Sequence, residues 1–327
     1  MARLPLSRRC LPGLAALGLC LPAASRAQGP WPLRPITLIV PFPPGGSADA
    51  VARALQAPLA ALLGQPVVIE NRGGAGGAIG TAAVAQARAD GHLLLLFPTA
   101  IMTISPHLVR LPYDPARDLA PVAMVATSDG VMAMHPRLPP RDMDSFLAYA
   151  RARPGQLRFG SAGPGTLTQL TGEIFAHAAG IRLEHVPYRG SAQALTALLA
   201  GEIELQFDPV AVPAVQEGRL VGLATTGEER SLQLPHLPTL RELGLWPPGD
   251  GGLSFFGIAG PAGLPAEVIE HLASALREVL ARPEVARVLH PLGLRPRFEA
   301  GEAFAHRIAA DRALFGEVVR RTGTAVH

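Results

Sequence analysis

Twice along the chain, a short apolar strand leads through a glycine-rich loop into an amphipathic helix. The first passage runs from the apolar residues 36–40 into a loop at 41–49. The second runs from 157–160 through a loop at 161–166 into a helix at 167–179. Continuous apolar strands are typical of sheets that are covered on both faces, and strand–loop–helix units build parallel sheets. The two passages therefore predict an α/β fold with mostly parallel sheets.

The rest of the chain continues to alternate strands and helices until a Pro/Gly-rich stretch at 234–252 breaks the order. A strand near 254–259 follows, and the C-terminal part is predicted to be helical at 266–281, 283–289 and 302–322. A chain of this length is long enough for two domains of ordinary size.

The first 27 residues have the three-part layout of a secretory signal peptide. Arg8 and Arg9 lie in a basic start, an apolar run follows at 11–21, and Ser25 and Ala27 are the small residues that a signal peptidase reads. The apolar run is well short of the ~20 residues that a membrane-spanning helix needs. We therefore expect cleavage near Ala27 and export to the periplasm.

The export route stays open. The adjacent Arg8 and Arg9 fit a twin-arginine signal as well as an ordinary basic start of a general secretory signal. Lipidation at Cys20 is disfavoured, because Leu19 is too large for the position before a lipidated cysteine.

Removal of the signal peptide changes the chemistry that composition suggests. Residues 1–27 hold four of the 29 basic residues and none of the 26 acidic ones, so the rest of the chain has a net charge of about −1. Nucleic-acid binding, which needs a basic surface on the folded domain, is therefore not expected. Cys10 and Cys20 also leave with the signal peptide, which excludes disulfides, thiolate metal sites and a cysteine nucleophile.

Motifs for common cofactors and for catalysis are absent from the sequence. A phosphate-binding P-loop needs a lysine, and the chain has none. The glycine run at 73–80 fails the dinucleotide-binding pattern because Ile79 occupies the third glycine position. Phe159 stands where a nucleophile elbow around Ser161 needs glycine, and the histidines lack metal-ligand spacing. We therefore expect no cofactor, no metal and no enzyme, and an exported hydrolase is disfavoured because no positioned nucleophile and base are found.

The two glycine-rich loops carry the chemistry that remains. A helix N-terminus exposes unpaired N–H groups and the positive end of the helix dipole, and glycines let the backbone approach a ligand closely. Such a loop favours an anion without a basic side chain. Two of them facing each other would clamp a carboxylate, although both can also be ordinary strand-to-helix turns.

Several motifs occur in the order found in one family. Pro-Phe-Pro-Pro-Gly-Gly-Ser-Ala-Asp at 41–49 is followed by Gly-Gln-Pro-Val-Val-Ile-Glu-Asn-Arg-Gly-Gly-Ala-Gly-Gly at 64–77. Val-Pro-Tyr-Arg-Gly at 186–190, Phe-Asp at 207–208 and Phe-Gly-Ile-Ala-Gly-Pro-Ala-Gly at 256–263 come later. From about Trp31 to its C-terminus, the chain resembles the substrate-binding proteins of tripartite tricarboxylate transporters, also called TctC or Bug receptors.

The resemblance implies a periplasmic binding protein of the type II, Venus-flytrap class, with two α/β lobes, mostly parallel sheets and crossing strands. Lobe 1 would comprise 28–128 and 251–327, and lobe 2 would comprise 129–250. The implied function is capture of a small organic acid or amino acid with a carboxylate between the lobes, and its delivery to membrane permease subunits. A ligand-presenting sensor without its own permease is the alternative, and we expect a monomer.

The resemblance also implies the ligand-binding residues. Family receptors hold a carboxylate between the first-lobe and second-lobe loops, with the strand end after residue 98 and a residue nearer the hinge contributing. Here these positions are Phe42, Gly45, Gly46, Ser47, Asp49, Thr99, Ser161, Gly163, Gly165, Thr166, Gln169 and Asp208. Gln169 is a departure from the family, because many members carry a histidine there. A glutamine cannot become a cation, so its effect on the choice of ligand stays open.

Overall fold

A computed structural model describes residues 31–128, 130–227, 229–246 and 254–322 of the chain. The predicted signal peptide, its cleavage site and both cysteines lie outside these residues. None of the helices within the described ranges combines the length and apolar character that crossing a membrane requires.

Sheet A has six strands in the order β11-β4-β10-β3-β1-β2. These strands are β1 (Ile36–Val40), β2 (Val67–Asn71), β3 (Leu93–Pro98), β4 (Leu119–Ser128), β10 (Phe255–Pro261) and β11 (Leu294–Ala300). β1 pairs in parallel with β2 and β3, whereas β10 runs antiparallel to both β3 and β4, and β11 runs antiparallel to β4.

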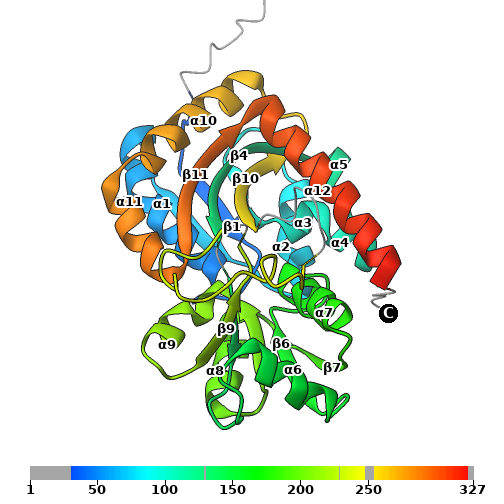
Figure 1. The fold of residues 1–327 in the computed structure, drawn as a ribbon. Helices are drawn as coiled ribbons and strands as arrows, with labels where there is room; N and C mark the ends of the chain where they lie inside the picture. Colours follow the sequence, from blue (N-terminus) through cyan, green and yellow to red (C-terminus); the bar gives the residue numbers. More distant parts are fainter. Residues whose placement is uncertain (1–30, 129, 228, 247–253, 323–327) are drawn as a thin grey trace, which may run out of the picture. The chain divides into compact units, whose positions relative to one another are not determined.

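Helices cover sheet A on both sides (Figure 1). On one side, α1 (Ser47–Leu63) packs against α10 (Ala266–Leu280) and α11 (Pro283–Leu289). On the other side, α12 (Gly301–Thr322) packs against the short helices α3 (Ala100–Thr103) and α4 (Ser105–Leu108). The remaining helices beside this sheet are α2 (Ala78–Ala85) and α5 (Pro115–Asp118).

Sheet B has five strands in the order β7-β6-β8-β5-β9. They are β5 (Val131–Met134), β6 (Leu157–Ser161), β7 (Leu183–Pro187), β8 (Leu205–Asp208) and β9 (Val221–Thr225). Its helices are α6 (Met143–Arg151), α7 (Leu167–Ala179), α8 (Ser191–Ala200) and α9 (Val212–Gln216). Its core includes a cluster of aromatic rings from Phe146, Phe159, Phe175 and Phe207.

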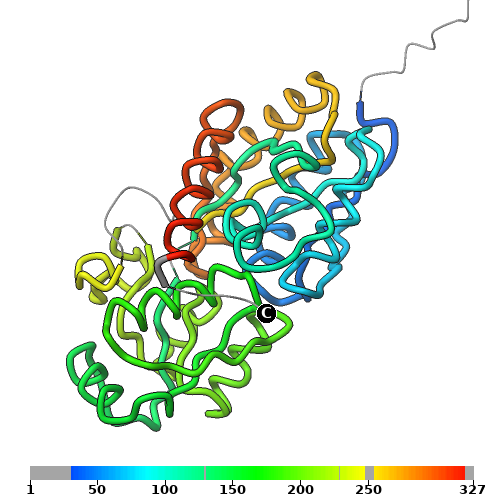
Figure 2. The backbone as a smooth tube through the Cα atoms, turned by 90° about the vertical axis from the view of Figure 1, so that its right-hand side faces the viewer, coloured from blue at the N-terminus to red at the C-terminus, as the bar shows by residue number. Residues whose placement is uncertain are grey.

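The chain leaves sheet A and returns to it at one place. β4 ends at Ser128 and β5 of sheet B begins at Val131, while Ser254 directly precedes β10. The N–H of Ser128 donates to the carbonyl oxygen of Ser254 at 2.9 Å. Figure 2 shows the two halves, with the green and yellow segment between these positions forming one of them.

The two-lobed α/β class is confirmed, with two corrections of detail. The sheets are mixed and not mostly parallel, because each sheet also contains antiparallel pairs formed by β5 or by β10. The C-terminal part is not only helical, since β11 forms the edge of sheet A next to β4. Its residues, Leu-Arg-Pro-Arg-Phe-Glu-Ala, lie between two helices and lack a continuous apolar run. The lobe boundaries at 128/129 and 250/251 stay a prediction.

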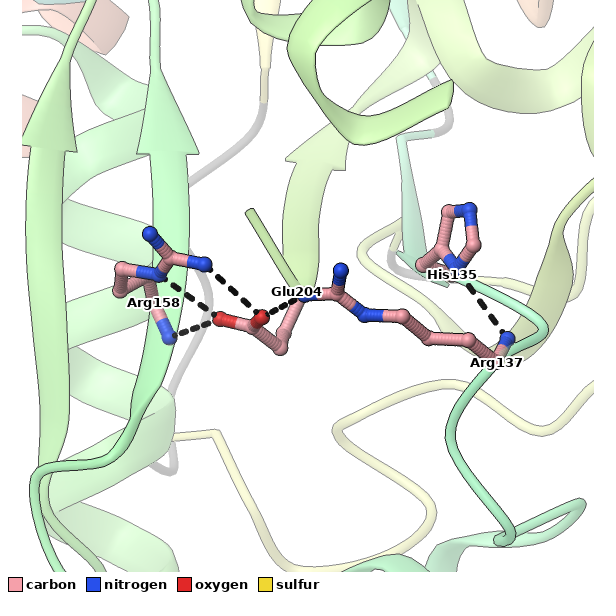
Figure 3. Close-up of polar contacts among 4 residues, drawn as sticks. All are labelled: His135, Arg137, Arg158 and Glu204. Carbon is pink, nitrogen blue, oxygen red and sulfur yellow. Dashed lines mark hydrogen bonds and ion pairs between the residues drawn. The ribbon is translucent and has the colours of Figure 1, made fainter. Parts of the chain in front are cut away.

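One carboxylate ties three neighbouring strands of sheet B together (Figure 3). Glu204 directly precedes β8 and accepts hydrogen bonds from the backbone N–H, Nε and Nη2 of Arg158 on β6, at 2.9, 3.1 and 3.1 Å. It also accepts from Nη2 of Arg137, which follows β5, and the backbone N–H of Arg137 donates to Nδ1 of His135. The amino ends of β6 and β8 and the carboxyl end of β5 are thereby joined.

Candidate functional site

A cavity of about 330 Å³ lies where strands of both sheets end. Its lining comes from the loops that follow β1, β3, β6, β7 and β8, from the end of β4 and from the start of β10. In open α/β sheets, ligands bind at the carboxyl ends of parallel strands, and a volume of this order suits a small organic molecule. This cavity is therefore the candidate ligand site.

Half of the residues predicted for the site line this cavity. They come from four different loops, and the structure brings them together although they are up to 166 positions apart in the chain. These residues are Phe42, Gly46, Ser47, Thr99, Thr166 and Asp208. Thr99 also holds β10 in place, because its hydroxyl donates to the carbonyl oxygen of Phe255 and accepts from the N–H of Phe255.

The other six predicted residues, Gly45, Asp49, Ser161, Gly163, Gly165 and Gln169, are not among the lining residues. They form the hydrogen bonds that shape the two loops from behind. Their direct contact with a ligand stays a prediction, whereas their positioning contacts can be described.

Asp49 organises the first loop. Its carboxylate accepts from the N–H of Gly45 at 3.0 Å, from Nδ2 of Asn71 at 3.0 Å and from Nε of Arg53 at 2.8 Å. Burial alone would raise the pKa of Asp49, but these three hydrogen bonds and the charge of Arg53 lower it below its usual value. The first loop is therefore held by an ionised side chain.

Neutral groups hold the second loop. Gln169 accepts the N–H of Gly165 at 2.9 Å through Oε1, and the hydroxyl of Thr166 donates to the carbonyl oxygen of Gly163 at 2.7 Å. The hydroxyl of Ser161 accepts the N–H of Gly163 at 3.1 Å. The amide that stands in place of the frequent family histidine thus has a structural contact of its own.

Ser161 and His185 form a pair that resembles half of a catalytic triad, with 2.7 Å between Oγ and Nε2. Neither residue lines the cavity, and Ser161 is fully buried. Burial lowers the pKa of His185 to about 4, which makes the ring a weak base at neutral pH. In the described part of the chain, no carboxylate hydrogen-bonds to this histidine. The pair therefore supports the second loop, and the geometry needed for nucleophilic attack is missing.

The sequence interpretation missed a third loop, which connects β7 to α8. Gly190, Ser191, Ala192 and Gln193 from this loop line the cavity. The motif at 186–190 was part of the family resemblance, but it holds one glycine where the other two loops hold several. A strand followed by glycine and serine at a helix start was the signal that could have found it. The remaining residues not predicted for the lining are Pro43, Pro44, Ala48, Pro98, Ala100, Ser128, Ala162, Leu167, Thr168, Pro209, Ser254 and Phe256.

Three helices point their N-termini at the cavity. Lining residues include the first residues of α1 (Ser47), of α7 (Leu167) and of α8 (Ser191). At none of these three described helix starts does the N-cap side chain bond a backbone N–H of the helix. The first N–H groups of a helix have no acceptor within it, so these termini favour an anion.

Asp208 is the single titratable side chain among the described lining residues. Its Oδ2 accepts from the hydroxyl of Ser191, and its Oδ1 accepts from the N–H of Val210 at 2.9 Å. Burial raises the pKa of Asp208 to about 6, although these two hydrogen bonds lower it in part. The cavity thus carries one acid that titrates near neutral pH.

Loops of sheet A contact loops of sheet B beside the cavity. The hydroxyl of Ser105 donates to the carbonyl oxygen of Gly165 at 3.0 Å. Gly76 has a positive φ of 63°, and a methyl group built on it would overlap the carbonyl oxygen of Pro164. The two halves are therefore closed on each other, to a distance that only glycine permits at position 76.

Within the described residues, histidine, cysteine, aspartate and glutamate side chains form no group of three or more that could hold a metal ion. The described lining contributes backbone N–H groups, hydroxyls, the amide of Gln193 and one carboxylate. This arrangement can bind a small anion.

Comparisons with known proteins agree with the resemblance seen in the sequence. Residues 51–323 match the profile of the family described as "Tripartite tricarboxylate transporter family receptor" (TctC). The chain is 37% identical over 301 residues to a UPF0065 protein in the tcbD-tcbE intergenic region of Pseudomonas sp. strain P51, covering 91% of this chain and 89% of the relative. It is 34% identical over 317 residues to protein BugT of Bordetella pertussis, covering 95% of each chain.

The fold is also similar to that of solved structures. The R. palustris protein Rpa4515, solved with adipate, superposes with a TM-score of 0.86 at 32% identity, covering 91% of this chain and 100% of the other.

Proposed function

We propose that this chain, which belongs to the tripartite tricarboxylate transporter receptor family, captures a small carboxylate-containing solute and delivers it to a membrane permease of the tripartite type. Members of this family are solute-binding receptors and not enzymes. The solute would be held between a lobe comprising 28–128 with 251–327 and a lobe comprising 129–250, a division supported by the membership of the two sheets. Export to the periplasm through the signal at residues 1–27 and action as a monomer belong to the same proposal.

The observation that carries this proposal is the convergence of three uncapped helix N-termini on one cavity, whose described lining residues include no catalytic pair. Together they offer backbone N–H groups to a carboxylate from both halves of the chain. The structure of Rpa4515 with adipate supports a carboxylic acid as the ligand class.

Ligand-dependent thermal stabilisation tests the proposal directly. A ligand that binds only the folded state raises the melting temperature. Purified protein without residues 1–27 is screened against aliphatic, aromatic and amino acids, and at least one carboxylate is expected to shift the melting temperature. If no acid in a broad panel produced a shift, the proposal would be wrong.

Closure of the two halves is tested at Gly76. In Gly76→Ala, the added methyl group would overlap the carbonyl oxygen of Pro164 and prevent the closed arrangement. We expect the affinity for the best acid to fall about tenfold or more, which corresponds to a loss of about 1.4 kcal/mol of binding free energy.

Gly64→Ala is the matched control for this variant. Gly64 has a similar positive φ of 67°, but a methyl group there would meet nothing within 4 Å. Both variants strain the backbone, so a loss of affinity in Gly76→Ala alone measures the contact between the halves. Equal losses in the two variants would speak against closure at this point.

A further inference from the structure

The charges that line the cavity are few. Among its described lining residues there is no arginine, lysine or histidine, and Asp208 is the one acid. Arg53 on α1 is hydrogen-bonded to Asp49, and neither residue lines the cavity. None of the described lining side chains would therefore neutralise a bound anion.

Positive charge in the cavity comes from helix ends. Each helix N-terminus is equivalent to about half an elementary charge, so α1, α7 and α8 together supply between one and two charges. The α8 terminus already faces an acid, because its first residue, Ser191, donates its hydroxyl to Asp208. The termini of α1 and α7 remain for a ligand, and their combined charge of about one matches one carboxylate.

Among the described elements packed against β8, no group is placed to balance a second negative charge beside Asp208. Of the elements packed against β8, the helix α8, the strand β5 and the segment Pro209–Ala211 carry no titratable side chain. Strand β6 carries Arg158, which is bonded to Glu204 at the other end of the strand. Helix α7 carries Glu173 and the exposed His177, and neither lines the cavity.

We propose that the cavity accepts a solute with one net negative charge, so that a monocarboxylate binds as it is and a dicarboxylate binds only with uptake of one proton. The inference rests on the proposed carboxylate-binding function. The proton comes from the solvent and lies between the second carboxyl group of the solute and Asp208. As this O–H bond forms, the bond to the same proton in hydronium or in the acid form of the buffer breaks, and no other covalent bond changes.

Uptake of this proton is favoured by the surroundings of Asp208. Burial already raises the pKa of Asp208 to about 6, and a second carboxylate beside it would raise that pKa further, because two like charges at close range cannot both stay ionised. The shared proton belongs to the pair of carboxyl groups and not to either one alone.

Calorimetric titration with hexanoate and adipate tests this inference. The two probes have the same carbon chain length and differ in the second carboxylate, and pairs from four to ten carbons and the aromatic pair 4-methylbenzoate and terephthalate extend the series. Titrations at pH 7.5 in phosphate and in Tris, whose ionisation enthalpies differ, give the number of protons taken up. We expect about one proton for each bound dicarboxylate and about none for each monocarboxylate.

The affinities give a second, independent measurement. Between pH 7 and 8 the affinity for a dicarboxylate should fall about tenfold, and the affinity for the matching monocarboxylate should stay within about twofold. Asp208→Asn should abolish most of the proton uptake that accompanies dicarboxylate binding. Asp144→Asn, which removes the same charge at an exposed position on α6, should behave like the wild type.

The outcomes separate this inference from the proposed function. Binding of monocarboxylates alone, or of dicarboxylates with proton uptake, supports it. A dicarboxylate that binds at pH 7.5 without proton uptake and with constant affinity from pH 7 to 8 overturns it, while the carboxylate-binding function stands. If no acid binds at all, the proposed function fails first, and the inference fails with it.

Discussion

Two acids at opposite ends of strand β8 meet opposite surroundings. Glu204 directly precedes the strand and Asp208 ends it, and their exposed fractions are 6% and 1%. Glu204 accepts hydrogen bonds from two arginines, whereas Asp208 accepts from a hydroxyl and a backbone N–H. The pKa of Glu204 is lowered, because the hydrogen bonds and charge of Arg158 and the hydrogen bond of Arg137 outweigh its burial. The pKa of Asp208 is raised.

The difference contrasts a stabilising contact at one end of the strand with the proposed binding site at the other. A buried carboxylate with cationic partners stabilises the fold as long as both partners are present. A buried carboxylate without a cation costs free energy, which natural proteins tolerate chiefly where it serves function. The four predictions below test this contrast, beginning with the largest effect.

Glu204→Gln should lower the free energy of unfolding by about 2.5 kcal/mol at pH 7.5. The change leaves two arginines without their carboxylate, and the loss falls just below the ~3–5 kcal/mol of a fully buried pair because both arginines are partly exposed. Urea denaturation measures it. Glu202→Gln, two residues earlier and exposed, is the control with the same change of charge. A loss no larger than that of the control would contradict the stabilising role of Glu204.

Asp208→Asn should have the opposite sign and raise the free energy of unfolding by about 1.5 kcal/mol at pH 7.5. The amide removes the cost of a buried charge and can keep both hydrogen bonds, since its oxygen accepts from Val210 and its nitrogen donates to Ser191. The same denaturation experiment at the same pH measures the change. A destabilised variant would show that the ionised acid, and not its neutral form, suits the fold.

The pH dependence of stability should separate the two acids. An acid with a raised folded-state pKa stabilises most below its unfolded pKa, and that contribution is lost as the pH rises through the folded value. For Asp208, whose pKa is about 6, the loss between pH 5 and 7 should be about 1 kcal/mol relative to Asp208→Asn. The contribution of Glu204, with its lowered pKa, is present throughout this range and is lost only at lower pH. Parallel curves for wild type and Asp208→Asn would contradict the assignment.

Loss of Arg158 or of Arg137 should lower the free energy of unfolding by the smallest amounts, and the two losses should differ. Arg158 donates to Glu204 through two side-chain nitrogens and Arg137 through one. Both side chains are exposed by 40% or more, so solvent screens them and each loss should stay below about 1 kcal/mol. Arg158→Ala is expected to destabilise more than Arg137→Ala when both are unfolded in urea side by side. The reverse order would show that the bond from Arg137 dominates.

The sequence predicted the framework of the site better than the roles within it. The first two loops were recognisable because glycines follow apolar strands, and α7 begins and ends where periodicity placed it. The roles of Asp49 and Gln169 could not be predicted, because hydrogen bonds behind a loop depend on rotamers that a residue pattern does not contain. Glu204 gave no signal, since its arginines lie 46 and 67 positions away. β11 was missed because its residues lack the continuous apolar run by which the other strands were recognised.

The bonded positions Ser128 and Ser254 have a consequence for how such molecules diversify. The segment between them enters and leaves through adjacent points, 2.9 Å apart at the backbone. Recombination at these two positions would exchange the whole segment between them. The distance between the two points where the segment joins the rest of the chain would stay the same. Three of the five loops that line the cavity lie in that segment. A pair of crossovers would therefore replace these three loops together, while β1, β3 and their loops stayed unchanged.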